Sequence, residues 1–148
     1  MRPTGCRAFP ARDQSPVNRN EVGGVPLQSQ KKVLVAESNE VVLVLISHIL
    51  TRQSYFVETS VDALEADLML QRVTYDALIV DAKVPNGGLD LIRRIAERDA
   101  SFLRKTVLLT STISDAAPVA HLPLGAIVKK PFEISDLVEV VQRAVVGG

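Results

Sequence analysis

Short apolar runs alternate with longer segments of helical character from residue 31 to the end of the chain. Each run has five or six residues and is followed by polar residues, which is typical of strands buried on both faces of a sheet. Regular alternation of strands and helices predicts an α/β fold, with a parallel sheet and helices on both of its faces. We expect strands at 32–36, 55–59, 76–81, 106–110 and 125–129, and helices at 39–53, 61–71, 89–98, 114–120 and 133–146.

The segment 39–53 is the hardest of these to interpret. It is rich in β-branched residues, which by propensity favour a strand. It is nevertheless long for a strand, and Ser38 or Asn39 is a suitable N-cap, with Glu40 in the first turn of a helix. We therefore predict a helix over these residues.

The segment 61–71 carries apolar residues at helical spacing, namely Val61, Leu64 and Leu68. This spacing is that of an amphipathic helix, whose apolar stripe usually faces the core. Ser60 precedes the segment and is suited to cap its N-terminus. We therefore predict a helix that begins directly after Ser60.

Charge and composition divide the chain into two parts. Residues 1–30 hold four of the eight prolines, four arginines and two acids, a net charge of +2, and show no helical or alternating period. Such a segment buries too little apolar surface to offset the entropy of ordering it, so we predict a flexible N-terminal tail. The remaining 118 residues, 31–148, have 13 basic and 15 acidic side chains and the size of one domain.

The same composition argues against several classes of function. The chain has 17 basic and 17 acidic side chains, and a net charge of zero disfavours a nucleic-acid-binding surface. The longest apolar run, Val41–Ile46, is far shorter than the roughly 20 residues that span a bilayer. A single cysteine excludes a disulfide framework. We therefore expect a cytoplasmic protein that binds neither nucleic acid nor membrane.

Polar side chains gather at the predicted carboxyl ends of the strands, where open parallel sheets bind their ligands. Glu37 and Ser38 follow the first strand, Asp81 ends the third, Thr110 ends the fourth and Lys130 follows the fifth. Carboxylates can hold a hard cation such as Mg²⁺, and a lysine can offset charge on a phosphoryl group. Each residue alone is better explained by helix capping or turn formation, whereas the combination favours phosphoryl transfer to a carboxylate.

The order and spacing of these pieces resemble the receiver domain of two-component response regulators. The resemblance rests on Val33–Glu37, Tyr75–Pro85, Leu108–Ser111 and Lys130-Pro131-Phe132, and it covers nearly all of residues 31–146. It implies a flavodoxin-like, doubly wound sheet of five parallel strands in the order 2-1-3-4-5. It also implies a phosphoacceptor signalling domain rather than an enzyme.

The resemblance implies a role for each matching residue. Asp81 is the implied phosphoacceptor, and Glu37 is the first of two acids that help to hold Mg²⁺, the implied cofactor. Lys83 would ligate the metal through its backbone carbonyl. Thr110 matches the hydroxyl that turns toward the phosphoryl group, and Lys130 matches the family's lysine at the site.

The chain departs from the family pattern in ways that bear on this site. Ser38 stands where the family usually has its second acid, so we expect it to be a weak ligand and Mg²⁺ affinity to fall. The loop 84–89 is about one residue shorter than usual, and Pro118 interrupts a short segment, so we expect a stunted or absent fourth helix. We expect the cationic side chain of Lys83 to replace part of the lost positive charge.

The leading hypothesis is a stand-alone receiver that accepts a phosphoryl group on Asp81 from a histidine kinase or a histidine phosphotransfer protein. It would signal by contact with a downstream protein, and a homodimer is a further candidate assembly. The main alternative is a degenerate receiver that binds its partner without phosphorylation, which Ser38 favours.

Two enzyme-like or cofactor-binding alternatives fit less well. A phosphatase of the haloacid-dehalogenase type needs a second aspartate two residues after its nucleophile, and Lys83 occupies that place. A flavodoxin-like cofactor site needs a phosphate loop rich in hydroxyls and glycine, and Glu37 and Glu40 would repel a phosphate there.

Overall fold

The computed structural model of this 148-residue chain describes residues 21–22, 25–26 and 30–147. The chain divides into two units, residues 1–30 and 31–148. In the described part of the first unit, β1 (Glu21–Val22) and β2 (Val25–Pro26) form an antiparallel pair. This pair has no counterpart among the elements predicted from the sequence. Most residues of the predicted flexible tail lie outside the described residues.

Five parallel strands form the sheet of the second unit. Counted along the chain within this sheet, they lie side by side in the order 2-1-3-4-5, which confirms the order that the resemblance implies. Ala36 is paired with Val80 and Asp81 with Leu109, so the carboxyl ends of neighbouring strands meet at one edge. In spatial order the strands are β4 (Phe56–Ser60), β3 (Lys32–Ala36), β5 (Ala77–Asp81), β6 (Thr106–Thr110) and β7 (Ala126–Lys129).

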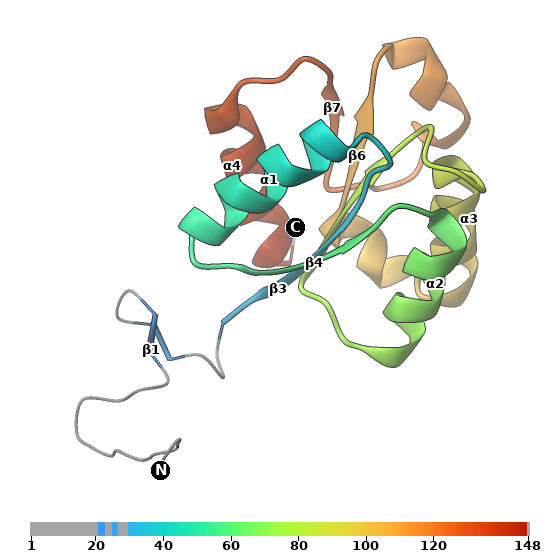
Figure 1. Ribbon diagram of the computed structural model, residues 1–148. Coiled ribbons are helices and arrows are strands. Elements are labelled where there is room, and N and C mark those ends of the chain that lie inside the picture. Colours follow the sequence, from blue (N-terminus) through green and yellow to red (C-terminus); the bar gives the residue numbers. More distant parts are fainter. Residues whose placement is uncertain (1–20, 23–24, 27–29, 148) are drawn as a thin grey trace. The chain divides into compact units, whose positions relative to one another are not determined.

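Helices cover both faces of this sheet (Figure 1). One face packs against α1 (Glu40–Arg52) and α4 (Ile134–Val145), and the other against α2 (Ala63–Arg72), α3 (Gly88–Arg98) and the 3₁₀ segments η2 (Ala100–Lys105) and η3 (Ile113–Val119). The central strand β5 serves both cores, since Ile79 packs with α1 and α4 while Leu78 and Val80 pack with α2 and α3. No helix in the described residues has the length and apolar character needed to cross a membrane.

The structure confirms the helix predicted over residues 39–53, where β-branched residues would by propensity favour a strand. Of the two predicted caps, Asn39 is the one used: its Oδ1 accepts hydrogen bonds from the backbone N–H groups of Val41 (3.0 Å) and Val42 (3.2 Å). The helix buries Leu43 and Ile46 against the sheet. Capping and burial of one apolar face together outweigh the modest strand preference of valine.

The start of α2 differs from the prediction. The cap is Asp62 rather than Ser60, and its Oδ1 accepts hydrogen bonds from Leu64 N–H (2.7 Å) and Glu65 N–H (3.2 Å). The side chain of Ser60 instead donates to the main-chain oxygen of Asp62. The helix therefore begins at Ala63, two residues later than predicted.

The apolar stripe predicted for this helix faces outward, so that expectation is wrong. Val61, Leu64 and Leu68 are each about half exposed. The residues buried on its other side are Ala63, Ala66 and Asp67, and Met69 and Leu70 pack partly buried against the same core. Spacing alone cannot show which side of a helix faces the core when apolar residues lie on both of its sides.

The fourth crossover contains only the 3₁₀ segment η3, which confirms the prediction of a stunted helix. Pro118 lies inside η3 and has no N–H with which to continue a helical ladder. The side chain of Thr112 caps the segment by accepting from Asp115 N–H. The chain after β6 therefore forms a short 3₁₀ segment in place of an α-helix.

Replacing Asn39 by alanine removes the oxygen that caps α1. We expect Asn39→Ala to lower the free energy of unfolding by about 1 kcal/mol, because two backbone N–H groups lose their acceptor. Urea unfolding followed by circular dichroism measures this change. Asn39→Ser keeps a capping oxygen and should stay close to wild type, and an equal loss in both variants would contradict the capping role.

Candidate functional site

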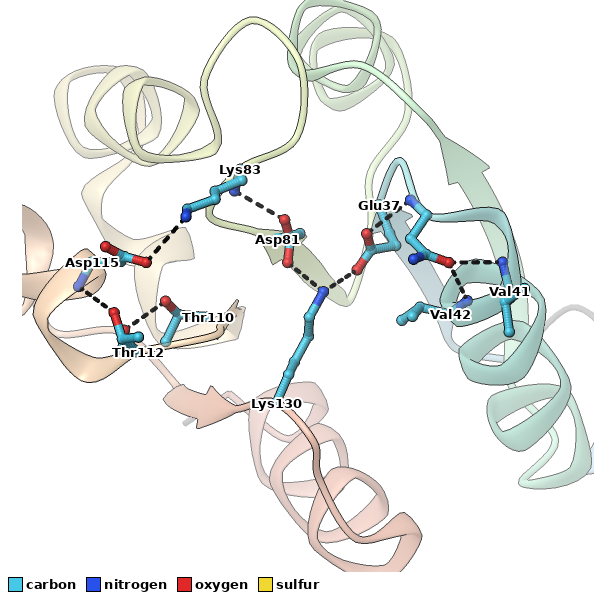
Figure 2. A network of polar contacts seen from close by, with 10 residues as sticks. Glu37, Val41, Val42, Asp81, Lys83, Thr110, Thr112, Asp115 and Lys130 are labelled. Atoms are coloured by element: carbon cyan, nitrogen blue, oxygen red, sulfur yellow. Dashed lines mark hydrogen bonds and ion pairs between the residues drawn. The ribbon is translucent and has the colours of Figure 1, made fainter.

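Two buried carboxylates meet at the carboxyl edge of the sheet. Glu37 directly follows β3 and is 1% exposed, and Asp81 ends the neighbouring strand β5 and is 7% exposed. Lys130, which follows β7, lies between them with its Nζ 3.0 Å from Glu37 Oε1 and 2.7 Å from Asp81 Oδ1 (Figure 2). Three residues predicted for the site are thus in direct contact, although Glu37 and Lys130 are 93 positions apart in the sequence.

Backbone amides fix the orientation of both carboxylates. The N–H of Asn39 donates to Glu37 Oε2 at 3.0 Å, and the N–H of Lys83 donates to Asp81 Oδ2 at 2.9 Å. Each carboxylate therefore has one oxygen on the Lys130 ammonium and the other on main chain. These two amides were not among the predicted contacts, because loop geometry rather than residue type decides which N–H faces a side chain.

The ammonium of Lys130 is held in its charged form. Burial lowers its pKa, but the hydrogen bonds to Asp81 and Glu37 and the charges of these two carboxylates outweigh burial and raise the pKa above its ordinary value. With both carboxylates ionised, the cluster has a formal charge of −1. A further cation is therefore attracted to this edge of the sheet.

The hydroxyl of Thr110 is turned to its own chain. Thr110 is buried at the end of β6, and its Oγ1 donates to the main-chain oxygen of Thr112 at 2.7 Å. The main-chain oxygen of Thr110 accepts from the N–H of Lys130 at 2.8 Å, and the bond from Lys130 to Pro131 is cis. Thr110 therefore lies at the same edge as the carboxylates, and its hydroxyl proton is donated to the main-chain oxygen of Thr112.

The side chain of Lys83 forms an ion pair with a residue of η3. Its ammonium lies 3.5 Å from Asp115 Oδ2, in an ion pair whose lysine side chain is 74% exposed. In this structure the Lys83 ammonium therefore pairs with Asp115, and the positive charge next to Glu37 and Asp81 comes from Lys130. Asp115, five residues after Thr110, had no sequence signal that would have marked it, because the pairing depends on how η3 is placed beside the loop after β5.

The oxygen atoms at this edge fit a hard divalent cation. Mg²⁺ is usually held by one or two carboxylates together with waters, and Glu37 and Asp81 provide two. The described residues contain no group of three or more His, Cys, Asp or Glu side chains placed to hold a metal ion. Ser38 is exposed. The residues present therefore suit a magnesium ion held by the carboxylates of Glu37 and Asp81 together with water molecules.

A glycine allows the loop after Asp81 to pack against the strand end. A Cβ atom built on Gly88 would lie 2.2 Å from the main-chain oxygen of Asp81, which no real side chain tolerates. Any other residue at this position would displace the strand end or the start of α3. The short loop 84–89 is thus held directly beside the candidate phosphoacceptor.

The sequence matches the family described as the response regulator receiver domain over residues 33–142. The chain belongs to this family. Receiver domains are phosphoacceptor modules of two-component signalling and not classical enzymes. The matched region includes Glu37, Asp81, Thr110 and Lys130.

A curated transcriptional regulatory protein is similar in sequence to this chain. The chain is 31% identical over 109 residues to the phosphate regulon transcriptional regulatory protein PhoB of Rhizobium meliloti (strain 1021), which is 72% of this chain and 48% of that protein. The chain thus spans about half the length of this curated relative.

Solved structures of receiver domains share the fold. The CheY-like response regulator receiver domain protein from Methanospirillum hungatei JF-1 has a TM-score of 0.72 and 20% identity, covering 79% of this chain and 94% of that one. The receiver domain of sensor histidine kinase PA1611 from Pseudomonas aeruginosa PAO1 has a TM-score of 0.71 and 22% identity, covering 79% and 98%. That structure has a magnesium ion coordinated in its active site cleft.

Removing the Lys130 ammonium should leave two buried carboxylates facing each other. We expect Lys130→Met to lower the free energy of unfolding near neutral pH by about 3 kcal/mol, because the partner of a buried charge is lost. The Lys130 ammonium contacts both carboxylates directly, and its loss leaves two like charges close together without a cation between them.

Urea unfolding of this variant near neutral pH measures the loss. Lys129→Met is the matched control, since Lys129 is exposed and precedes Lys130 directly. The control should keep the stability of the wild type. An equal loss in both variants would contradict the pairing of Lys130 with Glu37 and Asp81 as its cause.

Proposed function

We propose that Asp81 accepts a phosphoryl group from the phosphohistidine of a histidine kinase or a histidine phosphotransfer protein. The observation that carries this proposal is the Lys130 ammonium bound to both Glu37 and Asp81 at the carboxyl edge of the sheet. A carboxylate oxygen of Asp81 attacks phosphorus, the phosphorus–nitrogen bond of the donor breaks, and the imidazole nitrogen keeps the electron pair. The product is an acyl phosphate on Asp81.

The residues around Asp81 have distinct roles in this transfer. Lys130 is already 2.7 Å from Asp81 and offsets negative charge on the transferred group. Magnesium, when bound, supplies further positive charge against the phosphoryl oxygens. The carboxylates of Glu37 and Asp81 and the main-chain oxygen of Lys83 would hold it, with Ser38 as a weak ligand.

Thr110 links the site to the surface. Its hydroxyl donates to Thr112 in this structure, and a turn toward a phosphoryl group on Asp81 breaks that bond. The released residue is Thr112, whose side chain caps the short 3₁₀ segment η3. Phosphorylation, which adds about −1.5 to −2 charge, would therefore shift the conformation of this segment and change what a downstream protein contacts.

A recess beside the site suits the approach of a phosphoryl donor. Val42 and Leu45 of α1 line it together with Lys130, Pro131 and Phe132. The surface of α1 next to it is apolar, since Val41 is 78% exposed. Such a rim favours a partner protein that covers the site and excludes water during transfer.

We also propose that the protein is located in the cytoplasm.

A degenerate receiver is the second candidate function. The hydroxyl of Thr110 is occupied by Thr112, and Ser38 adds no charge to the two carboxylates. Under this reading the chain binds its partner protein without a phosphoryl group. The phosphorylation experiment below distinguishes the two candidates.

Treatment with a small-molecule phosphodonor and Mg²⁺ tests phosphorylation directly. Intact mass spectrometry should show the addition of one phosphoryl group to the wild-type chain and none to Asp81→Asn. Asp76→Asn is a matched control, because Asp76 lies directly before the amino end of the strand that Asp81 ends, and it should be modified like wild type. No addition to wild type, with the donor or with a phosphorylated histidine protein, would support the degenerate receiver instead.

Restoring an acid at position 38 should strengthen metal binding. We expect Ser38→Asp to raise the affinity for Mg²⁺ on the order of tenfold, because it adds a third carboxylate beside Glu37 and Asp81. Calorimetric titration or chemical-shift changes report the dissociation constant. Ser38→Asn has a similar size without the charge and should change little, so equal gains in both variants would argue against a charge effect.

A further inference from the structure

The outer face of α2 carries a stripe of exposed apolar side chains. Leu64 and Leu68 are each 51% exposed, and Val61, just before the helix, is 52% exposed. Leucine and valine are among the residues most often buried in folded proteins. Within the described part of the chain, no element covers this stripe. A stripe of this kind marks a surface for interaction.

The orientation of α2 is fixed from its inner side. Asp67, only 9% exposed, accepts a hydrogen bond from Arg94 Nε at 3.1 Å and another from Arg98 Nη2 at 2.7 Å, both on α3. A rotation of α2 that buried Leu64 and Leu68 would break both ion pairs. The two ion pairs therefore fix the rotation of α2 about its axis, and this rotation places the leucines on the outer side.

Charges at the two ends of the stripe are opposite. Asp62 and Glu65 lie at its amino-terminal end and Arg72 at its carboxyl-terminal end. Arg72 is exposed, and the described residues provide no carboxylate that pairs with it. Glu65, Leu68 and Arg72 follow one another at helical spacing, so acid, leucine and arginine lie along one side of the helix.

We propose that this face, defined by Val61, Leu64, Glu65, Leu68 and Arg72, binds a second copy of the chain. With the two α2 helices antiparallel about a two-fold axis, the leucines of one copy pack against those of the other. The same arrangement brings Arg72 of each copy to the acidic end of the other and sets the helix dipoles antiparallel. This charge complementarity of the stripe with itself is what favours a second copy over an unrelated partner.

The α2 face is separate from the phosphoryl-transfer chemistry. It lies on the face of the sheet opposite to α1 (Figure 1). The recess beside Lys130 is lined by α1 and therefore lies on the other face. The α2 face is nevertheless joined to the loop after Asp81, because the N–H of Ala63 donates to the main-chain oxygen of Pro85 at 2.9 Å and the side-chain amide of Asn86 donates to Asp62. Pairing through α2 would therefore restrain this loop in both copies.

Sedimentation equilibrium of the full chain, from micromolar to millimolar concentration, tests the proposal. The weight-average mass should rise from 16.1 kDa toward twice that value. Leu68→Lys should weaken the dimer by at least about tenfold, because it places two like charges near the axis. Val44→Lys is the matched control: Val44 is 63% exposed on α1. It should dimerise like wild type, and circular dichroism checks that both variants are folded.

Charge reversal tests the antiparallel arrangement. Arg72→Glu and Glu65→Arg should each weaken the dimer by about tenfold, because two symmetry-related contacts become repulsive. The double variant should recover wild-type affinity. A mass of one chain at all concentrations, a dimer that persists in Leu68→Lys, a dimer lost in Val44→Lys, or a double variant weaker than either single variant would each overturn the proposal.

Discussion

The contact on which the candidate site depends is the Lys130 ammonium held between two buried carboxylates. Glu37 and Asp81 end neighbouring strands, so the sheet itself brings their negative charges together in a place with little water. Without a cation between them, two buried like charges would be left unpaired, which is strongly destabilising. Lys130 reaches them from the end of β7, which ties three strands of the sheet to one charged cluster.

The rest of the site is arranged around this cluster by main chain rather than by further charges. Amides of Asn39 and Lys83 orient the two carboxylates, and Gly88 lets the loop after Asp81 pack against the strand end. The same loop is bonded to the start of α2, and Thr110 is bonded to the segment that leads into η3. Short contacts that involve the main chain therefore connect the carboxyl edge of the sheet with α2 and with η3.

Sequence patterns predicted the strands well, because each is a short run of apolar residues buried on both faces. They also predicted Glu37, Asp81, Thr110 and Lys130 as members of one site, since the carboxyl ends of parallel strands lie at one edge. They did not predict the partner of the Lys83 ammonium or the side of α2 that faces the core. Those outcomes depend on Asp115 and on the ion pairs of Asp67, and both require elements that are distant in the sequence to be packed first.

By itself, the sequence determined the α/β architecture, the places of the helices and the set of polar residues at the strand ends, because hydrophobic period, turn residues and capping are local properties. Tertiary structure alone decided that Lys130 contacts both carboxylates, that the Thr110 hydroxyl is bound to Thr112, and that α2 turns its leucines outward. The physical reason is that side-chain direction and ion pairing are settled by competition among neighbours that only the folded chain brings within a few ångströms of one another.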